Sequence, residues 1–301
     1  MRITNKYNLP KAIVSSAEKD SHVMADFSVT QMLKGATEIA LGRVYGDQLQ
    51  MDASECINMM FGRAVHALFE EQESEGVLNE HYMTARSFAG FTVSGTADVI
   101  DTIARKIKDY KTCSSWKVIY KDYDDWKEQL KAYLYLWYTE TGEVYKDAEI
   151  VALIKDHSPT NAERDASYPQ SPIITVGFTY TYEEIMGVGE MWDQKIRQVL
   201  KMLGTEEFGV CSESERWAKP ATWAVMKAGR QSAVKVCATQ EDAVNYCDSN
   251  GFALGEGKPY SIVHRKGEDT KCMKYCVVGK CGFCPYRNEI TKGAEDGTEN
   301  S

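Results

Sequence analysis

The chain has 301 residues, of which 43% are hydrophobic and 26% charged, a composition that is ordinary for a globular protein able to bury a substantial core. Its formal net charge of −9 argues against a polycation that coats nucleic acid non-specifically, although it does not exclude an enzyme with a local basic channel. No stretch has the length and apolar character of a membrane span, and the N-terminus lacks an apolar signal core. We therefore expect a cytoplasmic protein.

The composition along the chain predicts four parts. We expect a flexible N-terminus over residues 1–25, because this stretch is polar, and a folded core over residues 26–204. Residues 205–290 differ in character, with aromatic and basic residues interleaved and a cluster of cysteines, and we interpret them as a separate extension. Residues 291–301 are polar and predict a disordered tail.

The first strong helix is predicted over residues 52–73. Asp52 and Glu55 have the spacing of a capping box, and apolar residues follow at helical spacing. That apolar stripe consists of Ile57, Met60, Phe61, Ala64 and Leu68. We expect the stripe to pack against the rest of the protein, with His66 and Glu70, four residues apart, on another face of the helix. Taken alone, such a pair is most simply a solvated polar face.

Residues 81–112 predict a two-stranded ribbon that carries an unusual set of charges. Asp98 ends the polar face of the first strand, and Asp109 and Lys111 share one face of the second strand. If the strands pair antiparallel, the two carboxylates approach within a few ångströms and repel each other unless a cation lies between them. Carboxylate oxygens suit Mg²⁺ or Mn²⁺, and Mn²⁺ also accepts imidazole. A hairpin with exposed charges is the alternative that the ribbon by itself leaves open.

The following segments alternate between helix and strand. Residues 124–139 predict an amphipathic helix, residues 149–157 a buried strand, residues 173–181 a further strand and residues 182–203 a helix. The intervening residues 158–172 predict a loop by their proline, serine and asparagine content.

Four motifs, GRAVHALFE, GTADVID, DYKT and QLKAY, follow one another in the predicted helix, ribbon and second helix. In order, spacing and secondary structure they resemble the motifs of RecB-type nucleases of the PD-(D/E)XK superfamily. The residues that match are Gly62, His66, Glu70, Asp98, Asp109, Lys111, Gln129 and Tyr133. The resemblance implies an α/β fold with a restriction-endonuclease-like core, in which helices flank a central mixed sheet, and a cysteine-stapled C-terminal extension.

The resemblance also implies an activity, metal-dependent hydrolysis of phosphodiester bonds in DNA. An Mg²⁺ or Mn²⁺ ion would be held by His66, Asp98, Asp109 and the backbone carbonyl of Tyr110, and Lys111 would position the attacking water. The catalytic residues would be Glu70, Asp98, Asp109, Lys111, Gln129 and Tyr133. The resemblance fits best an exonuclease of phage recombination or replication. Such an enzyme would act on linear DNA with weak sequence preference in the host cytoplasm.

Other interpretations of the same motifs remain open. One is a non-catalytic DNA-binding or assembly module that retains the nuclease fold, and another is a structure-specific endonuclease. A helicase or a single-strand annealing protein would be the expected protein partner of an exonuclease.

Cysteines are concentrated near the C-terminus, in KCMKYCVVGKCGFCPYR. This segment holds Cys272, Cys276, Cys281 and Cys284. Thiolates this close together in a cytoplasmic chain predict a zinc ion or a [4Fe–4S] cluster rather than disulfides. Related nucleases with an iron–sulfur staple use one cysteine upstream of the nuclease motifs, but Cys56 here lies within the predicted helix and is assigned to packing. We expect Cys211 to join Cys272, Cys276 and one of Cys281 or Cys284, with the iron–sulfur cluster preferred over zinc.

Overall fold

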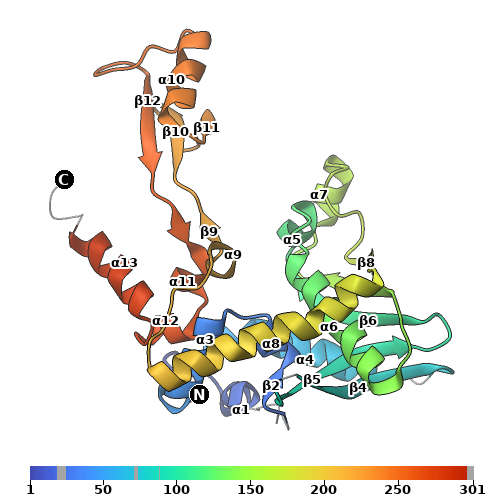
Figure 1. Ribbon diagram of the computed structural model, residues 1–301. Helices are drawn as coiled ribbons and strands as arrows, with labels where there is room; N and C mark the ends of the chain where they lie inside the picture. The colour runs from blue at the N-terminus through green and yellow to red at the C-terminus, as the bar shows by residue number, and fades with distance from the viewer. Residues whose placement is uncertain (19–24, 71–73, 88, 297–301) are drawn as a thin grey trace. The chain divides into compact units, whose positions relative to one another are not determined.

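The structure is a computed structural model that describes residues 1–18, 25–70, 74–87 and 89–296. The chain forms two compact units, Met1–Phe208 and Gly209–Ser301 (Figure 1). Part of the N-terminal stretch that we expected to be flexible forms strand β1 (Arg2–Thr4) and helix α1 (Lys11–Glu18). Part of the expected tail belongs to helix α13 (Pro285–Asp296), and its residues 297–301 lie outside the described residues.

A six-stranded mixed sheet forms the centre of the first unit, as the predicted fold class requires. Its strands are β2 (Phe27–Ser28), β4 (Val77–Arg86), β5 (Thr92–Asp101), β6 (Lys106–Cys113), β7 (Asp147–Ile154) and β8 (Ile173–Thr179). The order is β2-β5-β6-β7-β8, with β4 paired antiparallel along the other edge of β5. Strands β6 and β7 run parallel, so both end at the same edge of the sheet.

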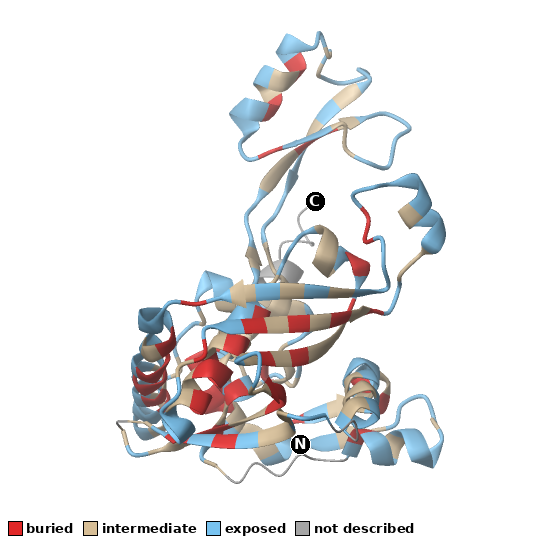
Figure 2. Cartoon of the chain, turned by 90° about the vertical axis from the view of Figure 1, so that its right-hand side faces the viewer, coloured by how far each residue is buried: buried red, intermediate tan, exposed pale blue. Residues whose placement is uncertain are grey.

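Helices cover this sheet and close the core of the first unit. The long helices α6 (Asp124–Thr141) and α8 (Tyr182–Thr205) pack together, and α3 (Ala36–Tyr45) packs on α8. Helix α6 is amphipathic, as predicted for residues 124–139, and its buried side includes Trp126, Leu130, Tyr133, Leu134 and Trp137. The buried residues gather in the sheet and in the helices against it (Figure 2). This core fixes the strands that carry the site.

Shorter elements complete the first unit. They are α2 (Val29–Met32), η1 (Gly46–Gln48), β3 (Gln50–Asp52), η2 (Ala53–Cys56), α4 (Ile57–Glu70), α5 (Ser115–Ile119) and α7 (Pro159–Arg164). Ser28 forms the capping box of α2 with Gln31. The predicted loop over residues 158–172 contains α7, because Ser158 caps a helix that starts at Pro159, a residue whose fixed φ suits the first helical turn.

Helix α4 corrects one sequence-based prediction. We expected its apolar stripe to pack inward, but no residue of α4 is buried, and Ile57, Phe61 and Leu68 are 45%, 51% and 68% exposed. The helix instead contacts β6, where the ring of Phe69 lies 4.6 Å from that of Tyr110. The orientation that brings His66 to the sheet therefore turns the stripe outward.

The second unit contains a small sheet and a set of short helices. The sheet has the order β11-β10-β12, from β10 (Thr222–Lys227), β11 (Lys235–Cys237) and β12 (Tyr260–Arg265), and α10 (Gln240–Ser249) packs on it. Strands β9 (Ala218–Lys219) and β13 (Glu268–Asp269) pair beside α9 (Glu213–Arg216), α11 (Thr270–Lys274) and α12 (Val277–Lys280). Cys237 and Cys247 lie in the small core of this unit. Within the described parts of the chain, no helix is long and apolar enough to cross a membrane.

Candidate active site

Three carboxylates lie in a row across three neighbouring strands of the first unit. The pairs on either side of Glu80, Asn79 with Val99 and His81 with Ala97, place Glu80 of β4 opposite Asp98 of β5. The antiparallel pairing of β5 with β6 ends at Val99 and Lys108, so the next step of the same register places Asp98 opposite Asp109. Residues that are directly opposite point to the same face of a sheet. Glu80, Asp98 and Asp109 therefore share one face.

Strand β6 leaves β5 at this row and stays with β7. Beyond Lys108, the backbone amide of Tyr110 donates a hydrogen bond to Oδ2 of Asp98 at 2.6 Å rather than to a backbone carbonyl of β5. Strand β6 remains paired with β7 over its whole length, Lys106–Cys113. The sheet thus opens between the two aspartates, and a buried carboxylate compensates the amide that the opening exposes.

Glu80 stands at a break in the regularity of β4. Its φ of +46° lies in the left-handed region, which residues other than glycine adopt at an energetic cost. Non-glycine residues held in this conformation cluster at functional sites. The carboxylate of Glu80 is 28% exposed, whereas that of Asp98 is only 5% exposed. The row therefore has one end accessible to solvent.

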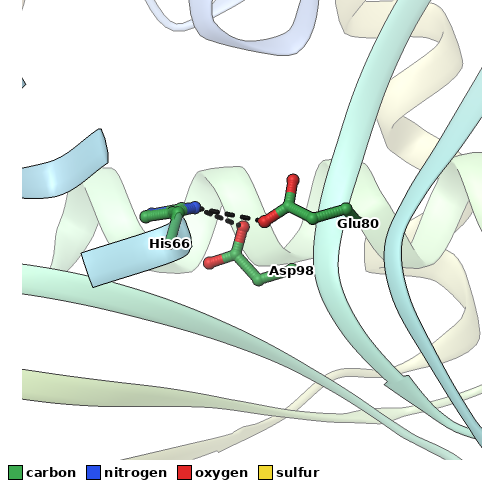
Figure 3. A group of neighbouring side chains, drawn as sticks. All are labelled: His66, Glu80 and Asp98. Atoms are coloured by element: carbon green, nitrogen blue, oxygen red, sulfur yellow. Dashed lines mark hydrogen bonds and ion pairs between the residues drawn. The ribbon is translucent and has the colours of Figure 1, made fainter. Parts of the chain in front are cut away.

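His66 of α4 lies between the first two carboxylates. Its Nδ1 is 3.3 Å from Oδ1 of Asp98 and 3.4 Å from Oε1 of Glu80 (Figure 3). The hydrogen bonds to Asp98 and Glu80 raise the pKa of His66 from 6.5 to about 10, against the opposing effect of its burial. In this arrangement a protonated imidazole supplies the positive charge that two facing carboxylates require.

Asp109 and Lys111 form the other half of the site. Nζ of Lys111 is 2.6 Å from Oδ2 of Asp109, a side chain that is 1% exposed. Oδ1 of Asp109 is equally buried and has no hydrogen-bond partner among the described residues. Burial raises the pKa of Asp109 to about 6; Lys111 opposes this shift and the charge of Asp98 adds to it. A buried carboxylate oxygen without a donor is a position that a cation would stabilise.

Gln129 and Tyr133 of α6 lie against the same row. Nε2 of Gln129 donates a hydrogen bond to the hydroxyl of Tyr133 at 2.7 Å. Burial raises the pKa of Tyr133 well above 10, and the negative charges of Asp109, Asp98 and Glu80 add to this shift. Tyr133 therefore stays protonated and lies within electrostatic range of all three carboxylates.

The structure brings most of the predicted residues together. Asp109, which we expected as a metal ligand, is not in the group of His66, Glu80 and Asp98 whose ligand atoms lie within 4.8 Å of one another. Glu70 is the last residue of α4 and is exposed, and it does not belong to the group of potential metal ligands. Tyr110 donates from its backbone amide to Asp98, and the role expected for its backbone carbonyl stays a prediction. Glu80, which the sequence analysis missed, takes the place beside His66 that we had considered for Glu70. The feature that could have identified Glu80 is its position opposite Asp98. That position follows only from the pairing of β4 with β5.

The donor set fits a hard divalent cation. One ligand atom each from His66, Glu80 and Asp98 lies within 4.8 Å of the others, and this is the one such group among the described residues. Bonds of about 2.1 Å to Mg²⁺ would draw ligand atoms to within roughly 3–4 Å of each other, a small adjustment for these side chains. Two carboxylates and an imidazole are donors that Mn²⁺ accepts, and water would complete the coordination.

The cysteines do not form a preorganised zinc site. No three cysteine sulfurs of the described residues lie within 4.8 Å of one another, whereas tetrahedral zinc with Zn–S bonds of about 2.3 Å requires sulfurs about 3.8 Å apart. Cys272 is buried, and burial raises its pKa to about 11; the nearby Asp269, Cys276 and Cys284 contribute to this shift. At least these three cysteines are neighbours in the second unit.

Comparisons with known proteins find similarity only at the level of solved structures. No family model matches the chain, and no curated protein matches it. The crystal structure of SSO0001 aligns with a TM-score of 0.44 and 16% identity over 62% of this chain and 83% of that chain. A phage-related exonuclease from Haemophilus somnus 129PT has a TM-score of 0.35 and 12% identity over 66% of this chain and 90% of that chain. An alkaline exonuclease from Laribacter hongkongensis has a TM-score of 0.35 and 11% identity over 60% and 90%.

Proposed function

We propose that this protein is a metal-dependent deoxyribonuclease with a site of the RecB-type PD-(D/E)XK kind. The observation that carries the proposal is the row of Glu80, Asp98 and Asp109, with His66 at one end and Lys111 at the other. Three carboxylates held on one face by strand register repel one another, so the arrangement is stable only with cations between them. Hydrolysis of a phosphodiester requires positive charge at this kind of site.

The residues of the row would hold an Mg²⁺ or Mn²⁺ ion, with His66, Glu80 and Asp98 as ligands and Asp109 adjoining them. When bound, such an ion polarises the phosphodiester and lowers the pKa of water. The ammonium of Lys111, held by Asp109, orients the attacking water and neutralises charge that develops on the phosphate oxygens. The hydrogen-bonded pair of Gln129 and Tyr133 fixes the buried side of the carboxylate row.

An enzyme explains the site better than a non-catalytic module. A module that only binds DNA needs basic side chains at its surface, but it has no need for a buried carboxylate with an unpaired oxygen beside a lysine. The buried carboxylate of Asp109, paired with the partly exposed Lys111, is costly for stability and is expected where it serves chemistry. We propose an exonuclease of phage DNA recombination or replication, located in the host cytoplasm and acting on linear DNA with weak sequence preference. A helicase or an annealing protein would be its partner, and a structure-specific endonuclease is the second candidate.

A cleavage assay tests this function. Purified protein is incubated with end-labelled linear duplex and with covalently closed circular DNA, in Mg²⁺, in Mn²⁺ or in EDTA. The proposal expects degradation of linear DNA that depends on the metal, with circular DNA intact. Cleavage of circular DNA would favour the endonuclease, and binding without any cleavage would favour the module.

A pair of variants assigns the cleavage to the site. Lys111→Ala is expected to lower kcat about 10²- to 10³-fold, because it removes the charge next to the developing oxyanion. Lys106→Ala is the matched control, since Lys106 lies on the same strand in an ion pair with Glu149 outside the carboxylate row. Equal activity of the two variants would contradict the assignment.

We also propose that the second unit carries a structural [4Fe–4S] cluster, with Zn²⁺ as the second choice. Cys211, Cys272 and Cys276 would be ligands, with one of Cys281 or Cys284 as the fourth; Cys284 lies near Cys272 and is the one tested below. Arg216 supports the inclusion of Cys211, because it donates to the carbonyl of Cys211 at 2.6 Å and forms an ion pair with Asp269, a neighbour of Cys272. The cluster would tie these distant segments together.

Spectroscopy separates the alternatives for the cysteines. A brown protein, purified without oxygen, with visible charge-transfer absorption and stoichiometric iron is the expected result. A colourless protein with one equivalent of zinc would select the second choice, and a colourless protein without metal would exclude both. Cys284→Ser is expected to remove the absorption, whereas Cys247→Ser, a cysteine of the small core, is expected to keep it.

A further inference from the structure

Two large aromatic side chains are exposed next to each other at helix α5, Trp116 within the helix and Tyr120 at its C-cap. Trp116 is 59% exposed and Tyr120 is 73% exposed. Their rings are stacked, with centroids 5.6 Å apart and an angle of 17° between the planes. Other aromatic residues of this region are packed inside, as in the stack of Tyr123 on the buried Trp126. Adjacent exposed aromatic rings on a folded unit mark an interaction site.

The aromatic pair is held firmly relative to the candidate active site. Helix α5 follows directly after β6, the strand that bears Asp109 and Lys111. Ser115, at its first turn, donates from its amide and its hydroxyl to the carboxylate of Asp156, at 2.6 and 3.2 Å. Asp156 follows β7, so the helix is anchored to both parallel strands. The chain therefore presents the two rings from a fixed place at the carboxyl edge of the catalytic strand.

An open pocket adjoins this aromatic surface. It lies between α5 and the segment around α7, which follow β6 and β7 and appear next to each other above the sheet (Figure 1). Ser115, Trp116 and Ile119 line one side, and Asn161, Arg164 and Tyr168 line the other. Ligands commonly bind at the carboxyl ends of parallel strands, where the connecting segments meet.

Cations for phosphate groups lie around the pair. Lys121 next to Tyr120 and Arg164 of the pocket are exposed, and Lys155 at the end of β7 is exposed while it donates to Asn58. The two carboxylates that also line the pocket, Asp156 and Asp165, accept hydrogen bonds from Ser115 and Ser167. Lys117 lies on α5 but is occupied by an ion pair with Asp125 at 2.8 Å. Cations for phosphates beside aromatic rings for bases are the two components of single-strand binding.

We propose that Trp116 and Tyr120 form a stacking platform for unpaired bases of the strand that enters the active site. The inference rests on the proposed nuclease function and specifies its substrate as single-stranded DNA or a duplex end that has been opened. Bases inside a duplex have their faces covered by neighbouring pairs, so only unpaired or terminal bases can stack on the rings. Stacking of a base on an aromatic side chain tolerates any sequence, which agrees with the weak sequence preference proposed above.

Binding of two single-stranded oligonucleotides tests the platform. One has ordinary bases, and the other has the same length and backbone with base-free tetrahydrofuran residues. Fluorescence anisotropy in Ca²⁺, chosen to limit cleavage, gives Kd for the wild type and for Trp116→Ala/Tyr120→Ala. The wild type is expected to prefer the oligonucleotide with bases by about 10- to 100-fold, and the double variant is expected to bind both alike.

Two further variants keep the result interpretable. Trp116→Phe/Tyr120→Phe preserves stacking and is expected to retain most of the preference, and Tyr7→Ala removes a tyrosine that is 71% exposed elsewhere and is expected to retain all of it. A double alanine variant that keeps the wild-type preference would overturn the inference, as would equal binding of both oligonucleotides by the wild type. Self-association that only the double alanine variant loses would overturn it in favour of a second copy of the chain. If the wild type shows the base preference but cleaves no DNA with any metal, the proposed nuclease function fails and the platform stands.

Discussion

Glu80 and Asp98 lie opposite each other on adjacent antiparallel strands, and a single nitrogen, Nδ1 of His66, lies within 3.4 Å of a carboxylate oxygen of each. Carboxylates that face each other across a strand pair destabilise the sheet unless a cation separates them. The protonated imidazole meets that need in the absence of metal, and a divalent ion would meet it with more charge.

Glu80→Gln is expected to weaken Mn²⁺ binding and to lower nuclease activity by about 10²-fold or more, because it removes one of the charges that hold the ion. The fold should persist, since the amide keeps the size of the side chain. Glu149→Gln on β7 is the matched control, because Glu149 pairs with Lys106 away from the site. Isothermal titration with Mn²⁺ and the cleavage assay measure both effects. Wild-type Mn²⁺ affinity in the Glu80 variant would remove this residue from the site.

Metal binding is expected to release about one proton at pH 8. In the metal-free protein His66 has a pKa of about 10 and is protonated at pH 8, whereas a metal ligand must be the neutral imidazole. The apparent affinity for Mn²⁺ therefore rises with pH until pH approaches 10. Asp109, with a pKa of about 6, contributes a second proton only near or below that pH. Calorimetry in buffers of different ionisation enthalpy counts the protons.

His66→Gln is the control for that count, because glutamine offers an oxygen ligand and has no proton to lose. The variant is expected to release close to zero protons at pH 8 and to bind the metal more weakly. If the wild type also releases no protons on binding Mn²⁺, His66 is either neutral in the metal-free protein or not a ligand. The proposal that the metal ion replaces the imidazolium charge would then be wrong.

The parts of the site that local sequence encodes could be predicted. His66 lies on a recognisable helix, and Asp98, Asp109 and Lys111 stand in two short strand motifs. Spacing alone left a solvated helix face and an exposed hairpin open, and the expectation that these residues meet came from the resemblance of the ordered motifs to a nuclease family. Glu80 could not be found in this way, because its place depends on the pairing of β4 with β5. A shift of that register by one residue would have turned its carboxylate to the other face.

Gly95 illustrates how the core supports the site. A Cβ atom at this position would lie 2.9 Å from Cε1 of Tyr133, 2.9 Å from Cγ2 of Val29 and 3.0 Å from Cδ1 of Leu136. Gly95→Ala is therefore expected to lower the free energy of unfolding by about 1–3 kcal/mol through overpacking. Gly177→Ala on β8, where a Cβ meets nothing within 4 Å, should change it by less than about 0.5 kcal/mol. Denaturant titration compares the two, and equal stabilities would show that the core around Tyr133 can adjust.

The exposed stripe of α4 gives a separate prediction about stability. Leu68→Ser is expected to change the free energy of unfolding by less than about 0.5 kcal/mol, because Leu68 is 68% exposed. Leu130→Ala in α6, a fully buried site, is expected to cost about 2–5 kcal/mol. A large loss of unfolding free energy in the Leu68 variant would show that Leu68 packs inward, as the sequence predicted.

That helix also shows where a periodic pattern misleads. The spacing of Ile57, Phe61 and Leu68 gave the existence of α4 correctly, but amphipathicity does not determine what an apolar face contacts. The contacts of His66 with Asp98 and of Phe69 with Tyr110 fix the rotation of the helix about its axis. Helix α6 had no such competing requirement, and its predicted apolar side is buried.

Crystals grown with Mn²⁺ provide the most direct test of the carboxylate row as a metal centre. Anomalous diffraction is expected to show a manganese peak within about 2.2 Å of Nδ1 of His66 and of one oxygen each of Glu80 and Asp98. The peak should be absent from crystals of the Glu80→Gln, Asp98→Asn double variant. A protein that cleaves DNA in Mn²⁺ while its manganese binds away from these three residues would contradict the account.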